Sequence, residues 1–312
     1  MAGVRRVVIT GGAGFIGSHL AEHFCALGVE VTVLDSLRSG YRHNLNGLKV
    51  DLVEGSVTDA GLVSSVLAGA DLVFHLAAMV SVPESLEKPG ECVDINVHGT
   101  LNVLNAARLH QVRKVVLSST CAVYGNDPAG PKNEAMRPAP ISPYGITKLD
   151  GEYYLDLYRA HWGLGTASLR YFNVFGPRQD PKSQYAAVVP IFISRAAKNE
   201  DLYIHGDGEQ TRDFIFVKDV VTANVQAASH AGTEGIYNVG RGHRVTINDL
   251  ARKIVDLVGS RSRIKHVPGR AGEIRHSTAD ISRLTSTGWA PQTDLEAGLR
   301  QTVDFFTSRL AV

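Results

Sequence analysis

Three glycines follow the first apolar segment of the chain at regular intervals, and they restrict its fold more than any other feature. Residues 7–10 are mostly apolar and β-branched, and they run directly into Gly11, Gly14 and Gly17. With this G-x-x-G-x-x-G spacing, the first glycine allows a tight turn, the second admits a pyrophosphate, and the third lets a helix pack closely. Free N–H groups at the start of that helix attract phosphate. The pattern predicts a strand, a dinucleotide-phosphate site and a helix over residues 16–27.

Short apolar segments alternate with helical patterns through residue 171. In the segment 96–110, Val97, Leu101 and Leu104 fall at i, i+4 and i+7 on one helical face. Strands are expected at residues 7–10, 31–34, 72–76, 115–118 and 166–171. Because these strands are almost continuously apolar, helices should cover both faces of the sheet that they form. The expected fold class is therefore α/β, with a doubly wound parallel sheet.

The pattern changes after Gly176, where a long polar loop begins. The later segments are a hairpin-like turn at 202–208, a strand near 236–240, an amphipathic helix at 247–258, a loop-rich stretch at 260–291 and a helix at 294–309. No internal repeat or low-complexity linker separates the two parts. We expect a dinucleotide-binding domain of residues 1–172, which the chain re-enters at about 214–240, and a smaller C-terminal α/β lobe of residues 173–213 and 241–312.

Composition limits the possible partners. Lys and Arg number 32 against 31 Asp and Glu, a net charge of +1, which offers no field for nucleic acid or an anionic membrane. No apolar run approaches the roughly 20 residues that cross a bilayer. Cys25, Cys92 and Cys121 lie far apart, so neither a disulfide framework nor a metal site is expected. We expect a cytoplasmic protein without a metal.

An acidic residue ends the second predicted strand. Asp35 lies eighteen residues beyond Gly17, where a carboxylate can accept hydrogen bonds from the adenosine ribose and repel a 2′-phosphate. Arg38, three residues further on, could soften that exclusion. We interpret the site as one for NAD rather than NADP.

Tyr144 and Lys148 are one helical turn apart, directly after Ser142 and Pro143, a typical helix start. A free phenol, with a pKa of about 10, is a poor base at neutral pH. Lowering that pKa to about 7 requires ~4 kcal/mol of phenolate stabilisation, to which a nearby ammonium and a nicotinamide cation can contribute.

Three hydroxyl residues, Ser118, Ser119 and Thr120, end the strand that begins at Val115. Open α/β sheets place their ligands at the carboxyl ends of their strands. Alone, each of these motifs could be strand capping or a chance pair. Counted together with the glycines, they favour a functional site at this strand end over simple capping.

Taken together, the glycines, Asp35, the SSTCAVYG segment at 118–125 and the Tyr144–Lys148 pair resemble the extended short-chain dehydrogenases/reductases. More narrowly, they resemble the NAD-dependent sugar-nucleotide epimerases of the UDP-glucose 4-epimerase type. The resemblance covers nearly the whole chain and includes HLAA at 75–78, NVHGT at 96–100, RYFNVFG at 170–176, TRDFIFV at 211–217 and YNVG at 237–240. It implies a Rossmann fold, tightly held NAD and a UDP-sugar substrate, with hydride transfer from sugar C4 through a 4-keto intermediate.

The resemblance also implies roles for single residues. Tyr144 would be the general base for the sugar 4-hydroxyl, Lys148 would hold the nicotinamide ribose and lower the tyrosine pKa, and Thr120 would bind the 4-oxygen. The implied cofactor contacts are Gly11, Gly14, Phe15, Ile16, Gly17, Asp35, Ser36, Ser39, Gly40, Ser56, Val57, Leu76, Ala77, Ala78, Asn96, Ser118, Tyr144, Lys148 and Tyr171. The implied substrate contacts are Thr120, Tyr144, Asn173, Ala187, Val188, Tyr203, His205, Arg212, Arg270, Glu273 and Ser277.

Ser56 departs from the family pattern, which often has Asp there against the adenine amino group; a serine hydroxyl is a weaker acceptor. Asn173, Arg212 and Arg270 would bind the diphosphate, for which a guanidinium fork is well suited. Tyr203, His205 and Glu273 would hold the uridine.

Other reactions remain open. The related 4,6-dehydratases carry an Asp-Glu pair after the threonine, and UDP-glucuronate decarboxylases carry Glu at the second position, whereas this chain has Cys121 and Ala122. Epimerisation is therefore favoured over both. A UDP-glucuronate epimerase and a non-catalytic NAD-binding sensor are further alternatives, although the Tyr–Lys pair argues against a sensor.

Ser277 occupies the position that, in the family, lies beside the sugar 2-substituent. Epimerases restricted to plain hexoses often have Tyr there, and the smaller serine leaves room for an acetamido group. Residues 178–190 also resemble the loop of epimerases active on N-acetylated sugars. We predict activity on UDP-Glc/UDP-Gal and on UDP-GlcNAc/UDP-GalNAc.

The resemblance further implies a homodimer, formed through the helices after Thr100 and Tyr144. In the second helix, Tyr153, Leu155 and Leu157 would serve the core and the interface together.

Overall fold

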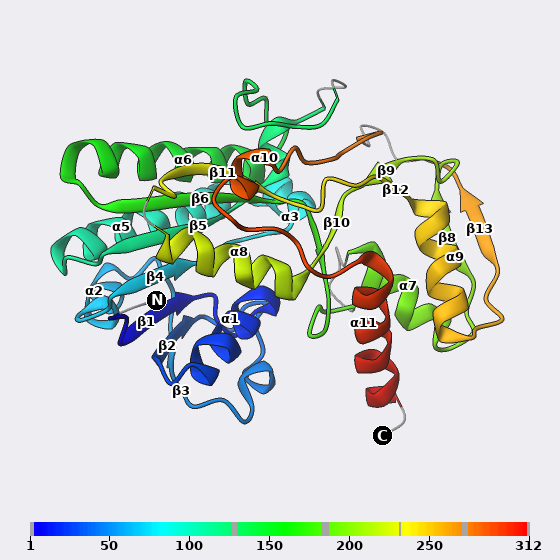
Figure 1. Cartoon of the computed structure of the whole chain (residues 1–312), viewed down its shortest axis with the longest axis horizontal. Helices are drawn as coiled ribbons and strands as arrows, with labels where there is room; N and C mark the ends of the chain where they lie inside the picture. The colour runs from blue at the N-terminus through cyan, green and yellow to red at the C-terminus, as the bar shows by residue number, and fades with distance from the viewer. Residues whose placement is uncertain (1–2, 127–129, 182–186, 231, 270–273, 311–312) are drawn as a thin grey trace.

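The structure, a computed structural model, describes residues 3–126, 130–181, 187–230, 232–269 and 274–310, with residues 309 and 310 as backbone only (Figure 1). Its centre is a seven-stranded sheet in the order β11-β6-β5-β4-β1-β2-β3, in which all neighbouring strands are parallel. The strands are β1 (Arg6–Thr10), β2 (Glu30–Asp35), β3 (Val50–Glu54), β4 (Leu72–His75), β5 (Lys114–Thr120), β6 (Gly165–Tyr171) and β11 (Gly235–Val239). The strand order reverses between β1 and β4, so the expected doubly wound sheet is confirmed.

Helices cover both faces of this sheet (Figure 1). On one face lie α1 (Phe15–Ala26) and α8 (Val217–Ser229); on the other lie α2 (Ala60–Leu67), α5 (Gly99–Leu109) and α6 (Pro143–Trp162). Successive strand side chains alternate between these layers: Val7 and Ile9 join the first core and Val8 joins the second. This two-sided burial explains why the strands are apolar without alternation.

Helix α6 begins where its sequence predicts. The Ser142 hydroxyl accepts the Gly145 N–H at 3.1 Å, and Pro143 occupies the first turn. The helix ends at Gly163, whose φ of +67° suits a residue without Cβ. This start places Tyr144 and Lys148 on successive turns of one face.

The predicted helix at 96–110 is preceded by two short helices, α3 (Val82–Glu87) and α4 (Pro89–Val93). A π-helical turn, Asp94–His98, then leads into α5. Single π turns of this kind are frequent at functional sites.

A second core lies outside the main sheet. Phe192, Ile204, Leu250 and Leu299 belong to it, and the helices α7 (Val188–Ala196), α9 (Ile247–Val258) and α11 (Leu295–Leu310) surround it. Figure 1 shows these helices beside the edge of the molecule that carries β8 and β13. Three two-stranded sheets lie outside the main sheet: β7 (Asn173–Phe175) with β10 (Phe214–Phe216), β8 (Leu202–His205) with β13 (Ile264–Val267), and β9 (Thr211–Arg212) with β12 (Val245–Thr246).

The hairpin expected at 202–208 is wrong. Gly206 and Gly208 do turn the chain, with φ of +75° and +77°, but β8 pairs in parallel with β13. The segment after the turn pairs elsewhere, as β9 with β12. The stretch 260–291 is accordingly less irregular than expected, since it holds β13 and the short helix α10 (Ser282–Thr285).

Three features bear on partner classes. Across the described ranges, every helix is too short or too polar to cross a bilayer. Cys25, Cys92 and Cys121 are free thiols. The part of the chain that the structure describes contains no group of three or more His, Cys, Asp or Glu side chains arranged to hold a metal ion.

Candidate active site

The turn between β1 and α1 is shaped for a phosphate. Gly11 has a φ of +71°, and a Cβ added there would lie 2.7 Å from the Ala77 backbone nitrogen. Gly14 is the N-cap of α1 and, having no side chain, leaves the first N–H groups of the helix without a side-chain cap. The first N–H groups of the helix, those of Phe15, Ile16 and Gly17, have no intrahelical acceptor. A close backbone approach and these free donors fit the pyrophosphate of a dinucleotide.

Asp35 is buried at the end of β2, beside this turn. Its carboxylate accepts the Ala13 N–H at 2.9 Å and the Leu37 N–H at 2.8 Å. Burial raises the pKa of Asp35, and the two N–H groups act in the opposite direction. The backbone of Gly40 packs against the same carboxylate, where a Cβ would lie 2.9 Å from both oxygens. Of the other residues expected here, Ser36 and Ser39 are exposed.

Arg38, which could have favoured NADP, is paired with carboxylates of the protein. Its guanidinium pairs with Glu84 of α3 at 2.7 Å and with Glu91 of α4. Two carboxylates therefore engage the arginine that, by its sequence position, could have accommodated a 2′-phosphate. This pairing agrees with a preference for NAD.

Leu76, Ala77 and Ala78 follow β4, and a buried histidine fixes their position. His75 lies 2.7 Å from Thr10 Oγ1 and 3.0 Å from Thr100 Oγ1. Thr100 donates its own proton to the Asn96 carbonyl, so it accepts from His75 Nε2, and Nδ1 is left to accept from Thr10. Burial, assisted by the charge of Lys148, lowers the pKa of His75 to about 3, so the ring is neutral.

The side chains of Asn96 and Ser56, both expected to contact the cofactor, hydrogen-bond other residues of the protein. The Asn96 amide accepts from the Met79 N–H at 2.7 Å and donates to Thr147 Oγ1 at 3.0 Å, which ties the loop after β4 to α6. The Ser56 hydroxyl lies 2.8 Å from that of Thr58. Val57 is buried against Gly99. In this arrangement Asn96 supports the segment that follows β4, and Val57 packs the segment that follows β3 against the start of α5.

Thr120, Tyr144 and Lys148 lie together where β5 meets α6. The Thr120 side chain hydrogen-bonds that of Tyr144, and burial raises the pKa of Tyr144 to about 12 although this bond opposes the rise. Lys148 Nζ donates to the Ser118 carbonyl oxygen at 2.8 Å. Burial lowers the pKa of Lys148 to about 8. A phenol, an ammonium and a hydroxyl at one strand end can move a proton to or from a bound alcohol.

A buried ion pair, which the sequence motifs did not include, supports this group from behind. Arg170 of β6 donates to both carboxylate oxygens of Glu152, at 2.9 and 2.6 Å, and Ser119 donates to the same carboxylate at 2.5 Å. Glu152 lies one turn beyond Lys148 in α6. An arginine within an otherwise uncharged strand was the available signal, since a buried arginine requires a partner.

Tyr171, expected near the nicotinamide, is opposite Thr120 in the β5–β6 register. Its hydroxyl donates to Asn224 Oδ1 of α8 at 2.9 Å, and its side chain also hydrogen-bonds Ser118. The ring therefore lies behind the strand end that carries the catalytic candidates.

A cleft of about 550 Å³ opens in the smaller lobe. Six of the expected substrate residues line it: Asn173, Ala187, Val188, Tyr203, His205 and Arg212. Among the described residues, Asn173 Oδ1 is buried without a hydrogen-bond donor, so an acceptor is available at the cleft wall. The Tyr203 ring is 43% exposed, with the Arg195 guanidinium 4.8 Å from its centre. An exposed aromatic face and nearby cations suit a nucleoside diphosphate.

Further lining residues were missed by the motifs. They are Val174, Val189, Ile191, Phe192, Arg195, Ile204, Gln210, Phe214 and Ile247. Most are apolar residues of ordinary core pattern, which cannot be told from interior residues by sequence. Gln210 had a signal, because it lies two residues before Arg212.

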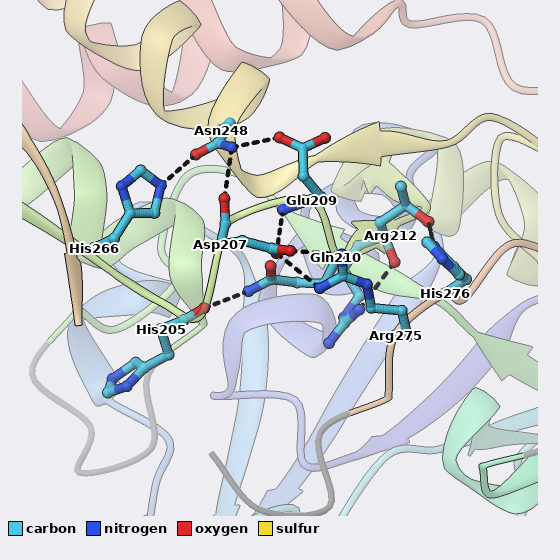
Figure 2. A network of polar contacts seen from close by, with 10 residues as sticks. His205, Asp207, Glu209, Gln210, Arg212, Asn248, His266, Arg275 and His276 are labelled. Carbon is cyan, nitrogen blue, oxygen red and sulfur yellow. Dashed lines mark hydrogen bonds and ion pairs between the residues drawn. The ribbon is translucent and has the colours of Figure 1, made fainter. Parts of the chain in front are cut away.

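A polar network fixes the segments around this cleft (Figure 2). Arg275 binds Asp207 through two hydrogen bonds of 2.7 and 2.8 Å. Asn248 donates to Glu209 at 2.7 Å and to the Asp207 carbonyl at 2.9 Å, and Gln210 donates to the His205 carbonyl at 2.9 Å. The strand that carries Arg212 is thus tied to α9 and to the segment that leads to Ser277.

Ser277 lies between the cleft and the catalytic candidates. Its N–H donates to the Thr211 carbonyl at 3.1 Å, and its side chain hydrogen-bonds the thiol of Cys121, the residue after Thr120. The expected contacts Arg270 and Glu273 lie outside the described residues, as do residues 182–186 of the loop compared above.

These features define a dinucleotide-dependent enzyme of the extended short-chain dehydrogenase/reductase class. Residues 7–240 match the model of the NAD dependent epimerase/dehydratase family, and the chain belongs to this family. NAD, expected from Asp35, is therefore confirmed as its cofactor.

Relatives match along nearly the full chain. The UDP-glucose 4-epimerase of Mycolicibacterium smegmatis is 41% identical over 97% of this chain and 99% of its own. A UDP-N-acetylglucosamine 4-epimerase of Methanobrevibacter ruminantium, solved with UDP-N-acetylmuramic acid, has a TM-score of 0.95 and 41% identity, covering 98% of this chain and 99% of its own. The UDP-glucose 4-epimerase of Thermus thermophilus, solved with NAD, has a TM-score of 0.90 and 39% identity, covering 98% and 100%. Decarboxylases and 4,6-dehydratases match at lower identity.

Proposed function

We propose that the protein is a UDP-hexose 4-epimerase that interconverts UDP-glucose and UDP-galactose and also UDP-GlcNAc and UDP-GalNAc. The observation that carries this proposal is the grouping of Thr120, Tyr144 and Lys148 with uncharged side chains at the next two positions, Cys121 and Ala122. The similarity to two UDP-glucose 4-epimerases and a UDP-N-acetylglucosamine 4-epimerase supports it.

In this mechanism Tyr144 removes the proton of the sugar 4-hydroxyl. Thr120, whose side chain is hydrogen-bonded to that of Tyr144, holds the 4-oxygen. The chemistry that bound NAD supplies is reversible acceptance of hydride from sugar C4. The buried Lys148, one turn from Tyr144, would hold the nicotinamide ribose, and its ammonium would favour the phenolate against the burial that raises the pKa of Tyr144. The same groups return the proton when the 4-keto sugar presents its other face, so no net oxidation occurs.

The cleft would hold the nucleotide end of the substrate. Arg212 and Asn173 would bind the diphosphate, and the exposed Tyr203 ring with His205 would bind the uracil. Anchoring by the diphosphate leaves the sugar free to turn over near Thr120. We further propose that residues 1–172 with 214–240 form the cofactor-binding lobe, and that residues 173–213 and 241–312 form the substrate lobe.

The small side chain of Ser277 supports activity on N-acetylated sugars. Ser277 and Cys121 are in hydrogen-bond contact beside Thr120, so neither presents a bulky group there. A tyrosine at position 277 would place a ring in the same space.

A dehydratase or decarboxylase would need a carboxylate close to the sugar. Asp213 is the carboxylate that interacts with Cys121, but its oxygens accept the N–H groups of Arg241, Gly242 and Ala279 at 2.8, 2.9 and 3.0 Å. Burial raises the pKa of Asp213 and these N–H groups act in the opposite direction, but the three bonds engage both carboxylate oxygens with the backbone and so hold them away from a substrate. This arrangement favours epimerisation.

The direct test is incubation of the enzyme with UDP-Glc, UDP-Gal, UDP-GlcNAc, UDP-GalNAc and UDP-GlcA, with the products separated by chromatography. We expect 4-epimers of the first four. A 4-keto-6-deoxy product, or a pentose with release of carbon dioxide, would contradict the proposal.

We also propose a homodimer formed through α5 and α6. Leu155 of α6 is 1% exposed and belongs to the core, whereas Tyr153 and Leu157 are 57% and 43% exposed. With Ile146 they form an apolar stripe at i, i+7 and i+11 on the outer face of α6. An apolar stripe on a long surface helix is typical of a helix–helix interface.

A further inference from the structure

The loop that follows β2 is fastened by its side chains on two sides. We call residues 36–41 the edge loop. From it, Arg38 reaches Glu84 of α3 at 2.7 Å and also Glu91 of α4. At its other end, the Tyr41 hydroxyl donates to Asp180 Oδ2 at 2.7 Å. The two contacts join segments that are 46 and 139 residues apart in the sequence.

The sheet order shows what the first contact crosses. β1 lies between β4 and β2, and Arg38 follows β2 while Glu84 follows β4. A bridge between these two segments therefore spans the carboxyl end of β1, where the glycine-rich turn begins. This is the switch point at which a doubly wound sheet binds its dinucleotide.

The second contact reaches a segment that is itself tied to α1. Arg178 binds Glu22 at 2.8 Å, and His19 Nε2 lies 2.9 Å from the Pro177 carbonyl oxygen. The Tyr41–Asp180 bond thus joins the edge loop to residues 177–180, which are themselves bonded to α1, the helix that begins at the glycine-rich turn. One bridge lies on the β4 side of the glycine-rich turn and the other on the α1 side.

The base of the edge loop is fixed to the glycine-rich turn. The Tyr41 N–H donates to the Ala13 carbonyl at 3.0 Å, and the Asn44 amide donates to the same oxygen at 2.9 Å. At the start of the loop, the Leu37 N–H binds Asp35. Because backbone and amide bonds anchor both ends of the edge loop, we expect the loop to open by breaking its side-chain bridges and not by moving as a whole.

Backbone conformation marks the same two places. Within the described chain, four residues other than glycine have positive φ, and two of them are Leu37 (+56°) and Arg178 (+67°). The other two, Gln111 and Asn199, follow helix ends, where this conformation is ordinary. Leu37 and Arg178 flank the two bridges. A side chain persists in this disfavoured region where surrounding contacts hold it, which occurs often at ligand clamps.

We infer that the edge loop retains NAD, and that Arg38 and Tyr41 are the positioning residues that hold it closed. A dinucleotide at the end of β1 is bounded by the Arg38 bridge on one side and by the Tyr41 bridge on the other. Release past the loop requires one bridge to break. The inference depends on the cofactor of the family and not on which sugar is epimerised, so it can fail while the proposed function stands, and the reverse also holds.

The test measures cofactor retention directly. Holoenzyme is mixed with excess radiolabelled NAD, and the first-order rate of exchange into the protein is followed by rapid filtration. Tyr41→Phe, which loses one hydrogen bond to a carboxylate, should exchange about tenfold faster than wild type, and Arg38→Gln, which loses two exposed ion pairs, should exchange at least about tenfold faster. The double variant should exchange about a hundredfold faster if the bridges act independently. Arg38→Lys, which keeps one ion pair, should be intermediate.

Arg42→Gln is the matched control. Arg42 directly follows the edge loop and pairs with Glu54 at the end of β3, away from the glycine-rich turn. It should exchange NAD at the wild-type rate. If the double variant exchanges like wild type, or if Arg42→Gln is accelerated as much as the edge-loop variants, the inference is wrong. Should Arg38→Gln fold poorly, Tyr41→Phe still decides, because it removes only a hydroxyl from a half-exposed ring.

Discussion

Lys148 Nζ lies 2.8 Å from the carbonyl oxygen of Ser118, so the strand that presents Thr120 also fixes the lysine of α6. The helix and the strand therefore share one position for the ammonium, whichever ligand is bound. Lys148 is buried one helical turn from Tyr144, so its charge is little screened by water, and Glu152, one turn further along α6, is a carboxylate that acts on it. The geometry of base and cation is built before the substrate arrives.

Loss of the Tyr144 hydroxyl should abolish most activity without unfolding the enzyme. Tyr144→Phe should reduce kcat by at least ~10²-fold, the usual scale for a missing general base, while bound NAD is retained. Tyr153→Phe is the control, because it removes a phenol hydroxyl from the outer face of the same helix. The measurements are the steady-state rate and the bound NAD content of wild type and both variants. Turnover of Tyr144→Phe close to that of Tyr153→Phe would remove Tyr144 from the mechanism.

Breaking the buried pair behind the site should cost stability. Glu152→Gln leaves Arg170 buried without its counter-charge, and we expect a loss of ~3–5 kcal/mol in the free energy of unfolding. Asp156→Asn, one turn further along α6, breaks an exposed 3.0 Å pair with Arg159 and should change it by less than ~1 kcal/mol. Urea denaturation measures both. Equal effects of the two substitutions would show that the buried pair is not special.

Acid should destabilise the protein through His75. Its pKa is lowered by burial from 6.5 to about 3, so below pH 6.5 the unfolded chain binds a proton that the folded protein does not. Stability contributed by this group is complete above pH 6.5 and falls by about 1.4 kcal/mol per pH unit as the pH drops toward 3.

Carboxylates such as Glu22, whose pKa is lowered to about 2, also lose stabilisation in acid, so the informative quantity is a difference of slopes. The free energy of unfolding should depend less steeply on pH in His75→Gln than in wild type between pH 6.5 and 4. The exposed His98 provides the control substitution, His98→Gln. Parallel curves for wild type and His75→Gln would contradict a neutral, buried His75.

A larger residue at position 277 should narrow the substrate range. Ser277→Tyr should lower kcat/KM for UDP-GlcNAc at least ~10-fold and leave that for UDP-Glc within a few-fold, because only the acetamido group needs the space. Ser277→Ala, which keeps the small volume, should retain both activities. If Ser277→Tyr keeps full activity on UDP-GlcNAc, Ser277 does not limit the pocket.

Charges on the outer stripe of α6 should separate the proposed dimer. The double variant Tyr153→Lys, Leu157→Lys should elute as a monomer in size-exclusion chromatography with light scattering, and wild type should elute as a dimer. Leu27→Lys places the same charge on a leucine of similar exposure, 54%, at the end of α1, and should remain dimeric. A monomeric wild type would show that the stripe does not pair.

Local patterns were predictable where the chain interacts with itself over short distances. The glycine turn, the start of α6 and the four-residue interval between Tyr144 and Lys148 all follow from neighbouring residues and are present in the structure. The parallel pairing of β8 with β13 was not predictable, because two four-residue strands about 60 positions apart carry no register signal. Arg38 illustrates the same limit: its partners Glu84 and Glu91 are distant in sequence, so its charge appeared available when it is not.

The turn Cys121–Tyr124 has one more consequence. Its backbone is held by the Thr120 hydroxyl on Ala122 N–H at 3.2 Å, by the Val123 carbonyl on Ala139 N–H at 2.9 Å, and by Gly125 at a φ of +63°. The side chains of Cys121 and Ala122 make none of these bonds. Substitution of either side chain would therefore leave these backbone bonds in place. The two positions that distinguish this chain from the related dehydratases and decarboxylases thus take no part in holding the backbone of the turn that carries them.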